Sequence, residues 1–256
     1  MSAPRFGFFF WPWSPEYTAR MAGLAERDGW DLVGIADTPG NAMDLWVALT
    51  LAATRTGRVG LAACVTNLAT RHPAITAGAA ADGAFVNYGL QPEHVAHAAA
   101  LLDDGAAQTG RAATDVETWW IACLDCAPTR EAAHASLGNI LGFVAAYILG
   151  PAPAARGVPA DLVSAVHELR ATYTTRHAEM DASLVRRLGL FDYLRRRLAI
   201  AGTPDDCVEQ AGAALTAGAT RLMFTVSLAS DPVRTVELFG AEVLPVLRRR
   251  YVRSGS

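Results

Sequence analysis

The chain has 256 residues, of which 52% are hydrophobic and 18% are charged, and its net charge at pH 7 is -3. This length and composition suit one α/β barrel or two small domains with a large buried core, and they argue against intrinsic disorder. The weak net charge gives no electrostatic basis for binding nucleic acid or an anionic membrane. Because all 22 basic residues are arginine, a lysine Schiff base and a P-loop lysine are excluded.

Strands and helices alternate along the chain. We predict strands at residues 6–11, 32–36, 59–65, 84–87, 116–124 and 221–226. We predict helices at residues 15–28, 41–54, 73–81, 92–107, 130–149, 204–217 and 232–249, with a further helical stretch from the loop at 150–159 to about residue 197. Apolar strands that alternate with helices indicate a parallel sheet covered by helices. No GxGxxG or GxxxxGK(S/T) motif follows the first strand, so a barrel of βα units is favoured over a Rossmann domain or a P-loop fold.

The hydropathy of the sequence and its cysteines indicate in which cellular compartment we expect the protein. No apolar stretch reaches the ~18 residues that a membrane helix needs, and the N-terminus lacks a signal-peptide core with a cleavage site. Four cysteines without a small-domain spacing suit a reducing compartment. Cys123 and Cys126 form a CxxC, but on a strand these positions face opposite sides, so we expect no metal site there. We therefore expect a cytoplasmic protein without a nucleic-acid or membrane partner.

One stretch carries more information than any other, at residues 61–75, with the sequence Leu-Ala-Ala-Cys-Val-Thr-Asn-Leu-Ala-Thr-Arg-His-Pro-Ala-Ile. It is an apolar strand that stops at polar residues and enters a helix with proline near its first turn. Together with Phe-Gly-Phe-Phe-Phe-Trp-Pro at 6–12, Asp-Thr-Pro-Gly at 37–40 and Ala-Gly-Thr-Pro-Asp-Asp at 201–206, it resembles the luciferase-like flavin and deazaflavin oxidoreductases. The resemblance is greatest to the deazaflavin-dependent branch that includes methylenetetrahydromethanopterin reductase.

The resemblance covers nearly the whole chain but lacks the family's fourth and fifth βα units. The predicted helix at 73–81 runs directly into the stretch at 81–93, which resembles the sixth strand and its helix. A barrel of about 250 residues has ~31 residues per unit, so roughly sixty residues are missing. The resemblance therefore implies an α/β, TIM-barrel-like (β/α) fold truncated to about six parallel strands, with additional helices near the C-terminus. We expect a single domain over residues 1–256 with a helical insertion at 150–200.

The absence of two βα units also affects which binding partners we expect. A sheet with fewer strands must close into a narrower barrel or remain open, and an open gap leaves strand edges that need covering. We therefore expect a homo-oligomer or a partner subunit over the gap, in addition to a small-molecule substrate.

Polar and aromatic residues at the ends of the predicted strands form the candidate site, because α/β folds bind ligands at the carboxyl ends of their strands. The resemblance implies three candidates for catalysis, which are Asp37, Thr38 and His72. It implies a larger set that frames the cofactor, which is Asp37, Cys64, Val65, Thr66, Asn67 and Asn87. Substrate contacts are expected from three tryptophans, which are Trp11, Trp13 and Trp120.

Each of these residue types also has a purely structural explanation. Asp37 suits a turn or the start of a helix, and Thr66 and Asn67 suit the end of a strand. Thr38 stands where some relatives carry a catalytic histidine, so proton chemistry does not transfer directly to it. Large aromatic residues on strands are usually core residues, and of two neighbours on a strand at most one faces the interior.

The function that the resemblance implies is hydride transfer between a cofactor and a small organic substrate. The expected cofactor is a deazaflavin, coenzyme F420, with flavin mononucleotide (FMN) as the alternative. A flavin-dependent monooxygenase of the same family is a second interpretation. A third is a binding or structural remnant completed by a partner subunit, because in relatives the missing strand ends supply much of the surface that holds the cofactor phosphate.

Overall fold

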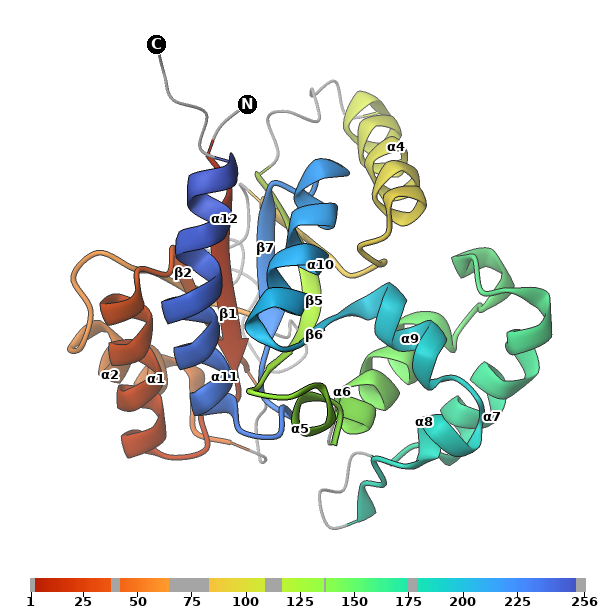
Figure 1. The fold of residues 1–256 in the computed structure, drawn as a ribbon, viewed down its shortest axis with the longest axis horizontal. Coiled ribbons are helices and arrows are strands. Elements are labelled where there is room, and N and C mark those ends of the chain that lie inside the picture. Colours follow the sequence, from red (N-terminus) through yellow and green to blue (C-terminus); the bar gives the residue numbers. More distant parts are fainter. Residues whose placement is uncertain are drawn as a thin grey trace.

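The computed structural model describes residues 3–37, 42–64, 83–108, 117–135, 137–174 and 179–251. In these residues a sheet of seven strands has the order β3-β2-β1-β7-β5-β4, with β6 also paired to β5, and every pair is parallel (Figure 1). The strands are β1 (Arg5–Phe10), β2 (Leu32–Ile35), β3 (Gly60–Ala63), β4 (Gly83–Val86), β5 (Glu117–Cys126), β6 (Ala199–Gly202) and β7 (Arg221–Thr225).

Helices follow most of the strands. They are α1 (Pro15–Asp28), α2 (Leu45–Ala53), α4 (Pro92–Gln108), α5 (Arg130–Ala135), α6 (Leu137–Val144), α7 (Val163–Thr172), α8 (Leu184–Arg187), α9 (Phe191–Leu198), α10 (Pro204–Thr216), α11 (Pro232–Leu238) and α12 (Leu244–Tyr251). Short π- and 3-10-helical turns are η2 (Ala145–Leu149), η3 (Ala154–Arg156), η4 (Ala160–Leu162) and η6 (Phe239–Val243). The predicted α/β class with a parallel sheet is confirmed. The predicted helix at 73–81 lies outside the described residues, and β6 was not predicted.

Local sequence explains where three of the helices begin. Ser14, Thr203 and Asp231 each accept a hydrogen bond from a backbone N–H of the helix that follows, and each is followed by proline. A capping oxygen satisfies one N–H at the helix start, and proline is tolerated there because its missing N–H would have no partner. These caps fix the short connections from β1, β6 and β7 into α1, α10 and α11.

The two faces of the sheet pack differently. Phe6, Phe8 and Phe10 are fully buried in a large cluster with residues of α1, α10, α11 and α12, so this face is covered by helices. The other face forms a small cluster made only of residues at or beside strands: Phe9, Leu32, Cys64, Phe85, Trp119, Ile121 and Met223. Each strand from β3 to β4 in the sheet order contributes to this inner cluster or adjoins it, so the cluster runs across the whole inner face of the sheet.

The sheet has a seam between β3 and β4. Among the described residues no ladder joins these two strands, and β3 pairs only with β2 while β4 pairs only with β5. Only residues 65–82 separate the two strands outside the described part, which is too short for two further units of ~31 residues each.

The helical segment α6–α9 lies beside the sheet (Figure 1) and has its own buried cluster. Leu141, Leu169 and Leu194 are fully buried in that cluster. By length and composition alone the run Arg130–Leu149 could cross a membrane. Its leucines at 137, 141 and 149 are fully buried inside the protein, which is what a core helix also shows.

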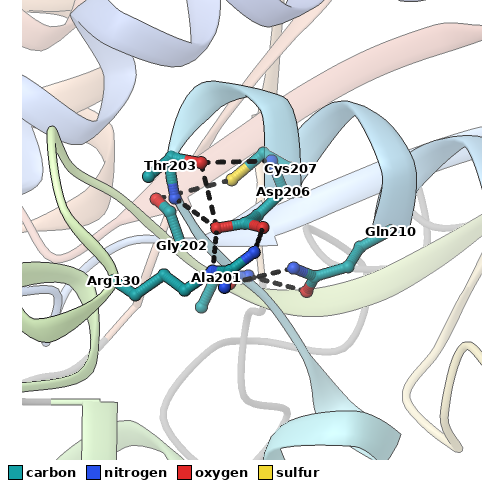
Figure 2. A network of polar contacts seen from close by, with 7 residues as sticks. All are labelled: Arg130, Ala201, Gly202, Thr203, Asp206, Cys207 and Gln210. Carbon is teal, nitrogen blue, oxygen red and sulfur yellow. Dashed lines mark hydrogen bonds and ion pairs between the residues drawn. The ribbon is translucent and has the colours of Figure 1, made fainter.

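Figure 2 shows the polar network where β6 enters α10. The Asp206 carboxylate accepts hydrogen bonds from the backbone N–H and the hydroxyl of Thr203, and from Nε and Nη2 of Arg130 at 2.8 and 2.6 Å. The Arg130 guanidinium holds the pKa of Asp206 well below its usual range. On the free edge of β6, the Gln210 side-chain amide pairs with both the N–H and the carbonyl of Ala201, as a neighbouring strand would.

Candidate functional site

Three adjacent strands deliver predicted site residues to one edge of the sheet. Phe10, Ile35 and Ala63 are the last residues of β1, β2 and β3, and they pair in register across the sheet. The next residues along each strand include Trp11, Asp37 and Cys64, and the Cys64 N–H still donates to the carbonyl of Ile35 at 2.8 Å. An acid, a thiol and an indole therefore stand at the carboxyl ends of three neighbouring strands.

Asp37 is the acid of this edge, and it is only 8% exposed. Shielding a carboxyl group from water costs free energy unless polar partners compensate it. Asp37 lies just beyond the carboxyl end of a parallel strand, which is where α/β folds bind their ligands.

Cys64 forms the floor below the edge. Its side chain is 1% exposed, and burial raises the pKa of its thiol to about 12, so the thiol stays protonated and is not a nucleophile at neutral pH. A Cβ added to Gly34 would lie 2.7 Å from the Cβ atoms of both Cys64 and Phe9, and 2.8 Å from Cε of Met223. The inner layer is therefore filled, and a planar ring would have to bind above it.

Trp11 and Trp13 stand at the end of β1. Their rings meet edge to face with centroids 5.1 Å apart, and Trp13 is 38% exposed. The backbone N–H of Trp11 donates a hydrogen bond to Oγ of Ser227, in the loop after β7, at 3.1 Å. The indole of Trp11 also contacts Phe143 of α6, with centroids 6.1 Å apart, so this pair links the sheet edge to the helical segment.

Asp125, near the end of β5, is a site residue that the sequence analysis missed. It is fully buried, and its carboxylate accepts hydrogen bonds from the N–H and hydroxyl of Ser230, at 2.8 and 2.9 Å, and from the hydroxyl of Thr235 at 3.2 Å. Burial raises the pKa of Asp125 to about 6 despite these bonds. The acid anchors the loop after β7, and the same loop holds Trp11 through Ser227. A lone acid inside the apolar run Ile-Ala-Cys-Leu-Asp-Cys was the available signal.

Comparison with known proteins identifies the family to which this chain belongs. The family model described as luciferase-like monooxygenase matches residues 12–82 and 75–221. The chain belongs to the luciferase-like monooxygenase family. The two matched segments meet at residues 75–82, the region where two βα units are expected to be missing.

Relatives in this luciferase-like family use F420 or FMN. The chain is 26% identical over 177 residues to 5,10-methylenetetrahydromethanopterin reductase of Methanopyrus kandleri, an alignment that covers 66% of this chain and 46% of that protein. The chain thus spans about half the length of the curated relative that it matches.

Solved structures of luciferase-like enzymes share the fold at low sequence identity. The coenzyme F420-dependent tetrahydromethanopterin reductase from Methanopyrus kandleri has a TM-score of 0.71 at 18% identity, covering 96% of this chain and 100% of that chain. An F420-dependent secondary alcohol dehydrogenase, in complex with an F420-acetone adduct, has a TM-score of 0.61 at 13% identity, covering 96% and 99%. The oxygenating constituent of 3,6-diketocamphane monooxygenase from Pseudomonas putida, in complex with FMN, has a TM-score of 0.59 at 13% identity, covering 95% and 99%. These likenesses show the fold alone.

The structure corrects the predicted role of Trp120 in this luciferase-like chain. It was expected to contact substrate, but its side chain lies in the helix-covered cluster and is 5% exposed. The neighbouring residue, Trp119, faces the inner cluster instead, where its Nε1 donates to Oε1 of Glu117 at 2.7 Å. Alternation along β5 placed the two rings on opposite faces, and only the contacts between strands decided which face each ring occupies.

The remaining predicted residues of the luciferase-like site are only partly described. Thr38, Val65, Thr66, Asn67 and His72 lie outside the described residues. Asn87 directly follows β4 and is half-buried, on the far side of the seam from Cys64. Its role in cofactor binding stays a prediction.

A buried arginine holds the loop that carries Asn87. Arg197 is fully buried, and it donates to four oxygens from three segments: the carbonyls of Tyr88, Arg156 and Gly157, and the hydroxyl of Tyr193. The Leu90 N–H also donates to the carbonyl of Arg197, so both its side chain and its backbone clamp the connection after β4. Burial and the nearby Arg197 cation lower the pKa of His94, which keeps this histidine uncharged at neutral pH. Arg197 and His94 were not singled out as site residues from the sequence.

The cysteines carry no metal site in the described part of the chain. All four are buried and free, and no group of three or more His, Cys, Asp or Glu residues is placed to hold an ion among the described residues. Cys123 lies in the cluster of the helical segment and Cys126 in the helix-covered cluster of the sheet, so the CxxC pair faces opposite sides of β5 as predicted.

Proposed function

We propose that this chain is a luciferase-like oxidoreductase that uses the deazaflavin F420 to transfer hydride to or from a small organic substrate. The observation that carries the proposal is the edge formed by Trp11, Asp37 and Cys64, in a chain whose curated relative is a methylenetetrahydromethanopterin reductase. The 26% identity to that reductase supports the deazaflavin as the first cofactor to test and FMN as the alternative.

The described residues fit a planar cofactor at this edge. The closely packed layer of Phe9, Gly34 and Cys64 lies below the edge, and the carboxyl group of Asp37, 8% exposed, lies at the end of the neighbouring strand. The cofactor, when bound, supplies the hydride chemistry at its C5 position. The protein contributes orientation and exclusion of water, with Asp37 holding the heterocycle edge and the tryptophans flanking the substrate. Val65, Thr66, Asn67 and Asn87 are proposed to complete the cofactor contacts, and Thr38 and His72 the catalytic set.

A second candidate is a flavin-dependent monooxygenase. It is favoured by one observation, the match of most of the chain to the family model described as luciferase-like monooxygenase. A third candidate is a binding or structural remnant completed by a partner subunit. It is favoured by the short connection between β3 and β4, because the resemblance implies that the missing strand ends supply much of the surface that holds the cofactor phosphate.

Titration of the purified protein with oxidised F420 and with FMN, followed by fluorescence quenching, distinguishes these candidates. Micromolar binding of F420 supports the proposed oxidoreductase, and tighter binding of FMN supports the monooxygenase. If neither F420 nor FMN binds at high micromolar concentration, the oxidoreductase and the monooxygenase are both excluded, and the structural remnant is the candidate that is left.

The same titration tests Asp37. We expect Asp37→Ala to weaken cofactor binding by about ten- to a hundredfold, since a hydrogen bond to a charged group is worth ~1.5–3 kcal/mol. Asp205→Ala is the matched control, because Asp205 is an exposed acid in the first turn of α10. Equal affinities for the two variants would show that the site lies elsewhere.

A further inference from the structure

Two hydroxyl groups stand at the carboxyl end of β7, beside the proposed substrate contact Trp11. Thr225 is the last residue of β7 and Ser227 lies in the loop that follows, and they are 4% and 7% exposed. Thr225 pairs with Phe9 of β1 on one side and with Cys123 of β5 on the other. Thr225 therefore lies in the middle of the sheet, on the strand next to the candidate edge.

Alternation along β7 places the side chain of Thr225 on the inner face of the sheet. Met223, two residues earlier, belongs to the inner cluster, whereas Phe224 and Val226 lie in the helix-covered cluster. Successive side chains of a strand point to opposite faces, so Thr225 points the same way as Met223. Its hydroxyl thus lies beyond the closely packed inner layer, toward the carboxyl edge where the cofactor and the substrate are proposed to bind.

Neither hydroxyl donates a hydrogen bond within the described residues. The oxygen of Ser227 accepts one, from the backbone N–H of Trp11 at 3.1 Å. The hydroxyl of Thr225 has no partner in that part of the chain, yet it is not one of the unpartnered polar atoms that are closed to solvent, as the hydroxyl of Thr18 is. A donor this shielded costs free energy until an acceptor reaches it. Two donors are therefore open to an acceptor that a ligand brings.

The charges around the two hydroxyls favour an uncharged acceptor. The described segments that follow β1, β2 and β7, at residues 11–14, 36–37 and 226–231, contain no lysine, arginine or histidine. They do contain Asp37, and Asp125 lies near the end of β5, the other neighbour of β7. These acids repel a carboxylate or phosphate ligand, and those segments offer it no cation. A carbonyl oxygen accepts hydrogen bonds from hydroxyl groups without bringing a charge.

We propose that the hydroxyls of Thr225 and Ser227 donate hydrogen bonds to a carbonyl oxygen of the substrate, and that the substrate is an uncharged carbonyl compound. A site with donors built for an oxygen rejects an analogue that lacks it, because the donors are then left unpaired. Calling this ligand the substrate rests on the proposed function, whereas the binding of a carbonyl group stands on the register, the burial and the open donor of Thr225.

The test uses two probes, 4-fluoroacetophenone and 1-ethyl-4-fluorobenzene, which lacks the carbonyl oxygen, with binding to the purified protein followed by ¹⁹F NMR. We expect Thr225→Val to raise the dissociation constant of the ketone by about three- to tenfold, because one uncharged hydrogen bond is lost, and to leave that of the hydrocarbon unchanged. Thr225→Ser keeps the hydroxyl and should keep the affinity for the ketone.

Thr18→Val is the matched control. It makes the same chemical change at a buried, unpartnered hydroxyl of α1 that is closed to solvent, so no ligand reaches it. A ketone affinity that is the same in Thr225→Val and Thr18→Val would overturn the proposal.

Thermal unfolding tests whether the hydroxyl of Thr225 is open in the folded protein. Because no hydrogen bond is lost, Thr225→Val should leave the melting temperature unchanged or raise it. Ser227→Ala removes the acceptor of the Trp11 N–H and should lower the melting temperature. A lower melting temperature of Thr225→Val would show that its hydroxyl is already bonded within the protein, which contradicts the open donor.

A third probe, 4-fluorobenzoate, tests the charge of the acceptor. This anion should bind the wild type more weakly than the ketone does, because acids stand on both sides of β7. Tighter binding of the benzoate than of the ketone would refute the uncharged carbonyl.

The cofactor titration separates this proposal from the oxidoreductase assignment. Thr225→Val should bind F420 as the wild type does, and a weaker affinity would mean that the hydroxyl contacts the cofactor, which overturns its assignment to the substrate. If neither F420 nor FMN binds but ketone binding still depends on Thr225, the oxidoreductase assignment fails and the carbonyl site stands. If a cofactor binds and ketone binding does not depend on Thr225, the carbonyl site fails and the oxidoreductase assignment stands.

Discussion

Asp125 is the residue on which the shape of the candidate edge depends most directly. It lies on β5, but its partners Ser230 and Thr235 are more than a hundred residues away in the sequence. Through the loop after β7, the same contacts set the position of Ser227 and hence of the Trp11 backbone. A single buried carboxyl thus links three segments of the site.

Replacing Asp125 tests this link and the cost of burying its charge. The amide of Asp125→Asn cannot accept from all three donors, so we expect a loss of ~1–3 kcal/mol in unfolding free energy at pH 7. The raised pKa of about 6 means that the folded state binds a proton between pH 6 and about pH 4, where the unfolded carboxyl remains ionised. The unfolding free energy of the wild type should therefore rise relative to that of Asp125→Asn as the pH falls from 7 to 4.

Urea unfolding of both proteins at pH 7 and pH 5 measures this difference. Asp205→Asn, which changes an exposed acid, serves as the control for general effects of charge. A stability difference between wild type and Asp125→Asn that does not change with pH would contradict the assignment.

At the scale of the elements, the inner face of the sheet and the outer helices tolerate side-chain volume differently. The strands approach closely at Gly34, where a Cβ would overlap Cys64, Phe9 and Met223. Gly23 on α1 has nothing within 4 Å of an added Cβ. The same chemical change should therefore have opposite effects in the two elements.

We expect Gly34→Ala to destabilise the protein by ~1–3 kcal/mol, because it overpacks the layer below the site. Gly23→Ala should stabilise it by ~0.5–1 kcal/mol, because alanine restricts the unfolded chain and favours a helix. Thermal unfolding of the two variants checks the signs. A neutral Gly34→Ala would mean that the inner layer is looser than described, with room for a ligand.

The elements also explain one local difference from the predicted pattern. The strand β6 has the sequence Ala-Ile-Ala-Gly, which periodicity cannot distinguish from the end of the preceding helix. It becomes a strand because it pairs with the end of β5 and because Gln210 closes its other edge. Both partners lie outside the segment itself.

For the whole molecule, the seam between β3 and β4 is the feature with the largest consequence. Strand edges with unpaired N–H and C=O groups invite another chain unless they are covered. Beside this seam, α2 exposes Trp46 and Val47, at 41% and 53%. Exposed apolar residues next to a sheet edge that no strand of the described residues pairs with are typical of an interface.

We therefore expect the protein to be an oligomer in solution, most simply a homodimer. Size-exclusion chromatography with light scattering measures the mass directly, and Val47→Glu should shift the protein toward the monomer because it buries a charge in the contact. Tyr147→Glu, on an equally exposed aromatic residue of the helical segment, should leave the mass unchanged. A stable monomeric wild type at micromolar concentration would count against a partner at the seam.

The sequence by itself determined the class of fold, the family and most of the elements. Apolar runs, capping residues followed by proline, and the strand end at 61–75 are local patterns, and local patterns survive whatever packs against them. Only the tertiary structure decided that Trp120 faces the helices, that Asp125 anchors a distant loop, and that Thr225 lies between β1 and β5. These outcomes depend on register and on contacts between residues far apart in the chain, and no local pattern encodes which partner a side chain will meet.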